Sequence, residues 1–170
     1  MGRKDVVPAT DVAPAHWLIQ EVTGFSGRVR DVVPARYHAF ARVVSVAHPM
    51  PLRRLCAVLG CHSQTDRCWF ALWDGWPAAD AWHGAPTFHL PHRDYLLFSG
   101  SLYDDLMIFA GDDRGPSLWW PEDRAWVVAS EVDSDSLYVA GSRPLIDDLL
   151  RADGLTVIEV GPDAAISVDE

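Results

Sequence analysis

The chain has few of the residues that define crosslinked or membrane-bound proteins. Only three of its 170 residues are cysteine, and an odd number argues against a disulfide framework. No apolar run approaches the ~18 residues that a membrane-spanning helix needs. The first residues carry charge but no hydrophobic segment of the kind that a secretory signal contains. These absences predict a soluble, cytoplasmic protein that makes no membrane contact and holds its core without disulfides.

The motifs of the common catalytic families are also missing. The sequence contains no G-x-S-x-G, no P-loop, no H-E-x-x-H and no G-x-G-x-x-G. Cys61 and His62 are adjacent, but adjacency in sequence does not give the orientation that a Cys–His catalytic pair needs. We therefore expect no enzyme activity, no catalytic residue and no cofactor.

Positive charge is scarce in the second part of the chain. Residues 1–98 carry 10 Lys and Arg against 8 Asp and Glu, whereas residues 99–170 carry 4 against 16. Nucleic acid is not an expected partner, because phosphate binding requires a clustered basic face. An acidic half can steer a basic protein partner towards itself. The alternative is a solvated acidic surface that aids solubility.

Length and periodicity predict one α+β domain. Apolar spacing, proline and serine at helix starts and glycine at helix ends predict helices within 11–23, 51–60 and 142–153. Hairpin-length connections between apolar runs predict an antiparallel sheet with about three helices on one side. The predicted domain spans 11–161, with flexible tails at 1–10 and 162–170. The predicted strands are 37–46, 68–73, 94–100, 105–111, 117–120, 125–132, 137–141 and 155–160.

Two groups of residues have metal-binding side chains. Cys56, Cys61, His62 and Cys68 lie close in sequence, but zinc needs four converging ligands, and buried free cysteine is the commoner fate. No metal is therefore expected, with a zinc-stabilised domain as an open alternative. Glu131, Asp133 and Asp135 alternate and would share one strand face. They could hold a divalent cation or act as acid and base, or simply form the wet face of the strand.

The eight tryptophans depart most from ordinary composition. Trp119 and Trp120 must point to opposite faces of a strand, so one can face solvent or a partner. Trp73, Trp76 and Trp82 lie at or beyond a strand end, in a stretch rich in glycine and proline. Exposed tryptophan in such a loop is typical of an interface. The alternative is a core with the loop packed over it.

Several segments resemble an uncharacterised family of actinobacterial proteins. The similarity rests on the blocks CWFALWDGW, RDYLLFSGSL, SLWWPEDRAWVVASEVD, YVAGS and LIDDLL, and it covers about residues 17–160. This resemblance supplies no mechanism. The layout also resembles, in architecture alone, the SUKH (SMI1/KNR4-like) immunity proteins, which are α+β domains that bind and neutralise bacterial toxins. That resemblance implies a protein partner.

These observations lead to a hypothesis and a rival. The hypothesis is a non-catalytic protein-binding domain, of immunity or antitoxin type, that docks a basic protein or toxin. Its predicted contact residues are Trp73, Asp74, Trp76, Trp82, Trp119, Glu122 and Asp123. The rival is a small-ligand binder or small enzyme, with a site where the loop 74–92 meets the hairpin 117–132. Its candidate groups are His89, His92, Arg93, Asp94, Glu131 and Asp133.

Overall fold

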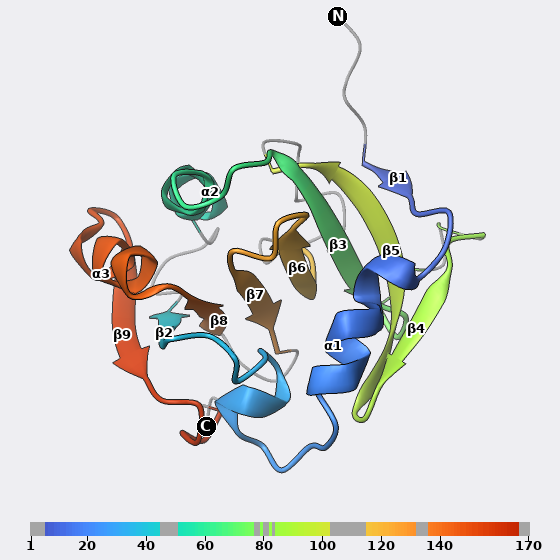
Figure 1. Ribbon diagram of the computed structural model, residues 1–170, viewed down its shortest axis with the longest axis horizontal. Coiled ribbons are helices and arrows are strands. Elements are labelled where there is room, and N and C mark those ends of the chain that lie inside the picture. The colour runs from blue at the N-terminus through green and yellow to red at the C-terminus, as the bar shows by residue number, and fades with distance from the viewer. Residues whose placement is uncertain are drawn as a thin grey trace, which may run out of the picture.

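A twisted antiparallel sheet forms the centre of the computed structural model (Figure 1), which describes residues 6–44, 51–76, 79, 82, 84–102, 115–131 and 136–166. Within this part the sheet has nine strands in the order β1-β5-β3-β6-β7-β8-β2-β9, and β4 also pairs with β5. Every pairing is antiparallel. The α+β prediction is confirmed. The strands are β1 (Val7–Pro8), β2 (Ala39–Val44), β3 (Arg67–Trp73), β4 (Thr87–Leu90), β5 (Arg93–Ser101), β6 (Leu118–Pro121), β7 (Val127–Ser130), β8 (Ser136–Gly141) and β9 (Thr156–Val160).

The hairpin between β6 and β7 has the tight turn that its sequence predicts. The amide of Arg124 donates to the carbonyl of Pro121 at 2.9 Å, so Pro121 is the first residue of the turn and Glu122 and Asp123 are its central residues. Arg124 adopts a left-handed conformation with φ of 57°. The turn therefore places an arginine where glycine or asparagine is commoner.

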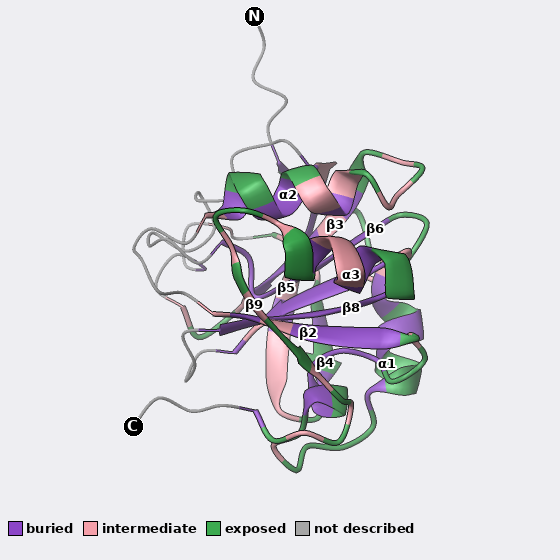
Figure 2. Ribbon diagram, turned by 90° about the vertical axis from the view of Figure 1, so that its left-hand side faces the viewer, coloured by how far each residue is buried: buried purple, intermediate pink, exposed green. Residues whose placement is uncertain are grey.

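Both faces of the sheet are apolar, because side chains alternate along each strand. Along β3, Cys68, Phe70 and Leu72 enter one buried cluster, whereas Ala71 enters the other. Strand β8 is buried along its whole length, and Figure 2 shows the central strands as buried. Such a sheet must be covered on both sides, since either face left bare would expose hydrophobic surface.

Helices α2 (Leu52–Gly60) and α3 (Arg143–Arg151) cover one face side by side (Figure 1). Ser142 caps α3, as predicted, since its Oγ accepts from the amide of Leu145 at 3.2 Å. Among the described residues no helix is long and apolar enough to cross a membrane. The residues that these helices bury against the sheet are Leu52, Leu55, Leu59, Leu145, Ile146 and Leu149.

Helix α1 (His16–Glu21) lies on the opposite face, so the expectation of three helices on one side is wrong for α1. It follows the 3-10 turn η1 (Ala13–Ala15) and packs with a second one, η2 (Val29–Asp31), against the second cluster. Trp17 meets Trp120 of β6 edge to face, with ring centroids 6.1 Å apart. Trp119 and Trp120 point to opposite faces of β6, because successive side chains alternate along a strand. Trp120 therefore needs a packing partner on the face opposite α2 and α3, and Trp17 of α1 is that partner.

Three segments that were predicted to be irregular or flexible are paired. Val7 and Pro8, in the predicted tail 1–10, pair with Ser99 and Phe98 of β5. Residues 162–166, in the other predicted tail, bond to residues 27–30 through backbone hydrogen bonds and a β-bridge between Arg28 and Ala165. Strand β4 lies within the predicted loop 74–92. The predicted strand 105–111 lies outside the described residues.

Candidate ligand-binding site

None of the eight indole rings, all within the described residues, is fully exposed. Trp17, Trp119, Trp120 and Trp126 are buried, and the other four are half-buried. Trp119 has 0% exposure, so its predicted role as a partner contact is wrong. Its ring packs against Phe70 and Trp126. Because both sheet faces are covered, neither side of β6 offers a ring to solvent.

Trp73, Trp76 and Trp82 keep part of their surface in solvent. Trp73 and Trp76 make an edge-to-face contact with centroids 5.6 Å apart, and Trp82 meets Phe98 in the same way at 5.1 Å. Asp74, between the first two rings, is exposed. The turn 73–76 is therefore the part of the predicted docking surface at which an acid and half-buried rings coincide.

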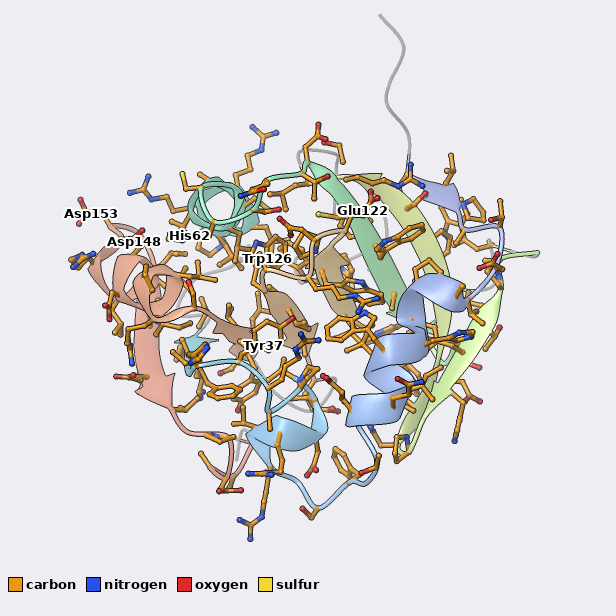
Figure 3. All side chains as sticks on the ribbon, viewed as in Figure 1. Tyr37, His62, Glu122, Trp126, Asp148 and Asp153 are labelled. Carbon is orange, nitrogen blue, oxygen red and sulfur yellow. The ribbon has the colours of Figure 1, made fainter. Side chains whose placement is uncertain are left out.

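Glu122 and Asp123 lie elsewhere, at the tip of the β6–β7 hairpin. The Asp123 carboxylate accepts from the amide of Gln64 at 2.8 Å and from the hydroxyl of Ser63 at 3.1 Å. Glu122 (Figure 3) makes an exposed ion pair with Arg67, at 3.7 Å. Asp123 therefore holds the hairpin to the loop after α2, and both acids interact within the chain.

The cysteine and histidine set is used for packing and for a helix contact. Burial raises the pKa of the Cys56 thiol to about 12 and also raises the pKa of Cys68, which disfavours the thiolates that bind zinc. Cys61 is exposed. His62 Nε2 lies 2.6 Å from Asp148 Oδ2, between α2 and α3 (Figure 3). Within the described ranges no three His, Cys, Asp or Glu side chains group as a metal site, and Asp133 and Asp135 lie outside those ranges.

Polar and aromatic side chains converge at one end of the sheet, and we name them the Arg93 cluster: Trp73, His92, Arg93, Tyr95 and Glu131. Antiparallel pairing brings the end of β3, the start of β5 and the residue after β7 to this end. Arg93 Nη2 donates to Glu131 Oε1 at 2.7 Å, with the side chains 20% and 7% exposed. The Arg93 guanidinium lies over the Trp73 ring at 4.7 Å.

Strand register explains why the sequence builds this cluster. Trp73 is directly opposite Tyr95, and Arg93 lies two residues before Tyr95 on the same face. The Trp73 ring packs over Gly75, where an added Cβ would fall 2.2 Å from Trp73 Cζ2. The glycine that ends the predicted strand therefore makes room for the ring that stacks on Arg93.

His92 lies at the edge of the cluster, in the turn between β4 and β5. Its ring stacks on Phe25 with centroids 4.5 Å apart and planes 19° apart. Nε2 lies 3.3 Å from the Tyr95 hydroxyl, whereas Nδ1 is buried and has no hydrogen-bond partner among the described residues. Desolvation lowers the pKa of His92 against the opposing influence of Glu131. The ring is therefore neutral at pH 7, with one nitrogen unsatisfied.

Phe25 reaches His92 because Asp31 organises the loop that carries it. The buried Asp31 carboxylate accepts from the amides of Ser26 and Arg28 at 2.8 and 2.9 Å. Desolvation raises the pKa of Asp31, but these hydrogen bonds outweigh it and hold that pKa below its ordinary value. Phe25 itself is 48% exposed. It is a large apolar side chain at the surface whose contact is a half-buried histidine.

The structure brings together only part of the set predicted for the rival site. His92, Arg93 and Glu131 meet, whereas His89 and Asp94 bond to each other across β4 and β5 on the opposite face. Alternation separates them, since Asp94 follows Arg93. Sequence reasoning missed Tyr95 and Phe25. The same alternation could have identified Tyr95, whereas no sequence signal links Phe25 to His92.

This arrangement suits binding more than charge chemistry. The cationic and anionic groups neutralise each other, burial raises the pKa of Tyr95, and His92 is neutral. His92 Nδ1 can donate or accept a hydrogen bond, depending on the tautomer.

Compared with known protein families, curated proteins and solved structures, the chain matches none.

Proposed function

We propose that the chain binds a small uncharged ligand at the Arg93 cluster and performs no reaction on it. The observation that carries this proposal is the buried Nδ1 of His92, which has no partner among the described residues. A buried polar atom without a partner costs about 1–3 kcal/mol. Native structures retain such an atom chiefly where a water, an ion or a ligand completes it.

The charges of the cluster argue for an uncharged ligand. Arg93 and Glu131 are already paired at 2.7 Å in a largely buried setting. A charged ligand would compete for one partner and leave the other unpaired, which is strongly unfavourable in the interior. A neutral ligand can use Nδ1 and leave the ion pair intact.

The rings around His92 argue for a planar ligand. Phe25 covers one face of the imidazole, and Trp73 stacks on Arg93 nearby. Aromatic walls with one placed polar group are typical of small-molecule sites. Phe25 is exposed enough to be displaced, so a heteroaromatic ring with an amide can take its place against His92.

A fragment titration tests this function. Heteroaromatic amides, each with its carboxylate analogue, would be titrated while the Trp73 indole and His92 imidazole signals are followed by NMR; nicotinamide and nicotinate are the first pair. We expect saturable shifts with amides and none with carboxylates, and loss of the shifts in His92→Phe. Ile158→Ala, which removes an exposed apolar side chain from β9, is the control and should keep the shifts. Shifts that persist in His92→Phe, or no saturable shift with any amide, would contradict the proposal.

Docking of a basic protein partner, as in immunity proteins, is the second candidate. The turn 73–76 favours it, since exposed Asp74 lies between two half-buried rings. Binding to a panel of purified basic proteins would be measured with Trp76→Ala and Asp74→Asn. Saturable binding that needs both residues supports docking, whereas binding that follows net charge alone argues against it.

A further inference from the structure

Two arginines lie against Trp17, on the face that carries α1. The guanidinium carbons of Arg36 and Arg124 lie 5.6 and 5.0 Å from the centre of its ring. The ring is 6% exposed, and its Nε1 is buried without a hydrogen-bond partner among the described residues. Two arginine cations therefore lie against the Trp17 ring, and the N–H donor of that ring has no acceptor among the described residues.

The backbone holds Arg124 at this place in a conformation that arginine rarely adopts. Its φ of 57° is the only positive φ of a non-glycine residue within the described ranges, and such a conformation costs about 1 kcal/mol or more. The hydroxyl of Tyr37 donates to the Arg124 carbonyl at 2.8 Å. Figure 3 shows Tyr37 on the same side of the molecule as α1. The hydrogen bond from Tyr37 therefore holds the turn in place, and Arg124 occupies a position where glycine would be less strained.

Of the two arginines, only Arg36 has a carboxylate partner among the described residues. Asp123 is occupied by Ser63 and Gln64. Arg36 forms a partly exposed ion pair with Glu21, with Nη1 3.6 Å from Oε1, which is longer than a hydrogen bond. No described carboxylate forms an ion pair with Arg124. In a chain of net charge −10, Arg124 is therefore a cation that can still take an anionic ligand.

We propose that Arg36, Arg124 and the Trp17 indole bind a phosphate group. Guanidinium forks match phosphate oxygens in two-point hydrogen bonds and are weakly hydrated, so they suit a site beside an aromatic ring. The exposed arginines can close over the phosphate, and a third oxygen can accept from Nε1 of Trp17. The bound molecule is a phosphate-bearing small molecule, and this site is separate from the Arg93 cluster.

Indole NMR with inorganic phosphate tests this site. The Trp17 indole signal, assigned through its loss in Trp17→Phe, would be followed during titration with phosphate at constant ionic strength, with acetate as the second probe. We expect a saturable shift with phosphate and a weaker response to acetate. Glu21→Gln should tighten phosphate binding, because it removes the competing carboxylate.

Arg124→Gly is the decisive variant. Glycine adopts the positive φ freely, so the turn keeps its shape while the cation is lost. We expect at least about tenfold weaker phosphate binding, since a hydrogen bond to a charged group contributes on that order. Arg53→Gln removes an exposed charge from α2 and should leave phosphate binding unchanged. No saturable shift of Trp17, equal binding by Arg124→Gly, or a response to acetate alone would overturn the proposal.

Discussion

At the scale of single residues, the unsatisfied nitrogen of His92 is the feature that most needs an explanation. The backbone around it is fixed by other contacts: Tyr95 by its strand, and the loop that carries the exposed Phe25 by Asp31. A ring held so firmly would be expected to have both nitrogens satisfied if it served packing alone. Two substitutions test the surroundings that produce this state.

The close contact between Gly75 and Trp73 predicts the effect of Gly75→Ala. The added methyl would fall 2.2 Å from a ring carbon of Trp73, so the ring that stacks on Arg93 must shift. Forced overpacking costs about 1–3 kcal/mol. We expect a lower free energy of unfolding in urea and a changed Trp73 indole shift. Gly24→Ala, where nothing lies near the added methyl, is the control, and an unmoved Trp73 signal would contradict the packing described.

The lowered pKa of His92 predicts a loss of stability in mild acid. The unfolded chain takes up a proton as pH falls below the ordinary value of 6.5, whereas the folded chain resists it until a lower pH because of desolvation. Falling pH therefore favours the unfolded state from 6.5 down to the folded pKa. Urea unfolding across this range should show the decline in the wild type and a smaller one in His92→Gln. Parallel curves for the two proteins would contradict the lowered pKa.

At the scale of elements, α3 and the β6–β7 hairpin are both tied by side-chain hydrogen bonds to backbone. Ser142 caps α3, and Asp123 ties the hairpin to the loop after α2. Trp126 joins the sheet to α2, since its Nε1 donates to the carbonyl of Leu59 at 3.1 Å (Figure 3). Such bonds fix how the layers meet.

Removal of the α3 cap predicts a moderate loss of stability. Ser142→Ala leaves the Leu145 amide without its acceptor, which costs about 1 kcal/mol in typical helices. Ser142→Gly should cost only a few tenths of a kcal/mol. Urea unfolding distinguishes the two, and equal losses would mean that the hydroxyl does not cap the helix.

The Trp126 contact predicts a larger effect. Trp126→Phe loses a buried hydrogen bond and leaves a cavity in a fully enclosed position, for a loss of about 1–3 kcal/mol. Trp69→Phe, at a half-buried position, should cost less. The prediction fails if Trp69→Phe is the more damaging change in urea unfolding.

Sequence patterns predicted elements better than they predicted surfaces. Periodicity and caps located α2, α3 and the β6–β7 hairpin, because these signals are local. The side of the sheet that α1 covers depends on Trp120, a hundred residues away in sequence. The burial of Trp119 likewise depends on layers that no local pattern shows. The pairing of Arg93 with Glu131 needed the strand order, although both residues were candidates.

At the scale of the whole molecule, two-sided coverage of the sheet decides what the chain can offer to a partner. The tryptophans mainly serve the two buried clusters. Two polar groups lie at the boundary between core and solvent, where indole rings pack against them. They are the Arg93 cluster and the arginines around Trp17. We therefore propose that recognition involves these polar groups, with the indole rings as their support.

A crystal structure of the protein soaked with the tightest-binding heteroaromatic amide would test the proposed ligand site at the level of single atoms. We expect the amide within hydrogen-bonding distance of His92 Nδ1, with the Arg93–Glu131 pair intact and Phe25 displaced or stacked on the ligand. An amide bound elsewhere, with Nδ1 packed only against carbon, would contradict it.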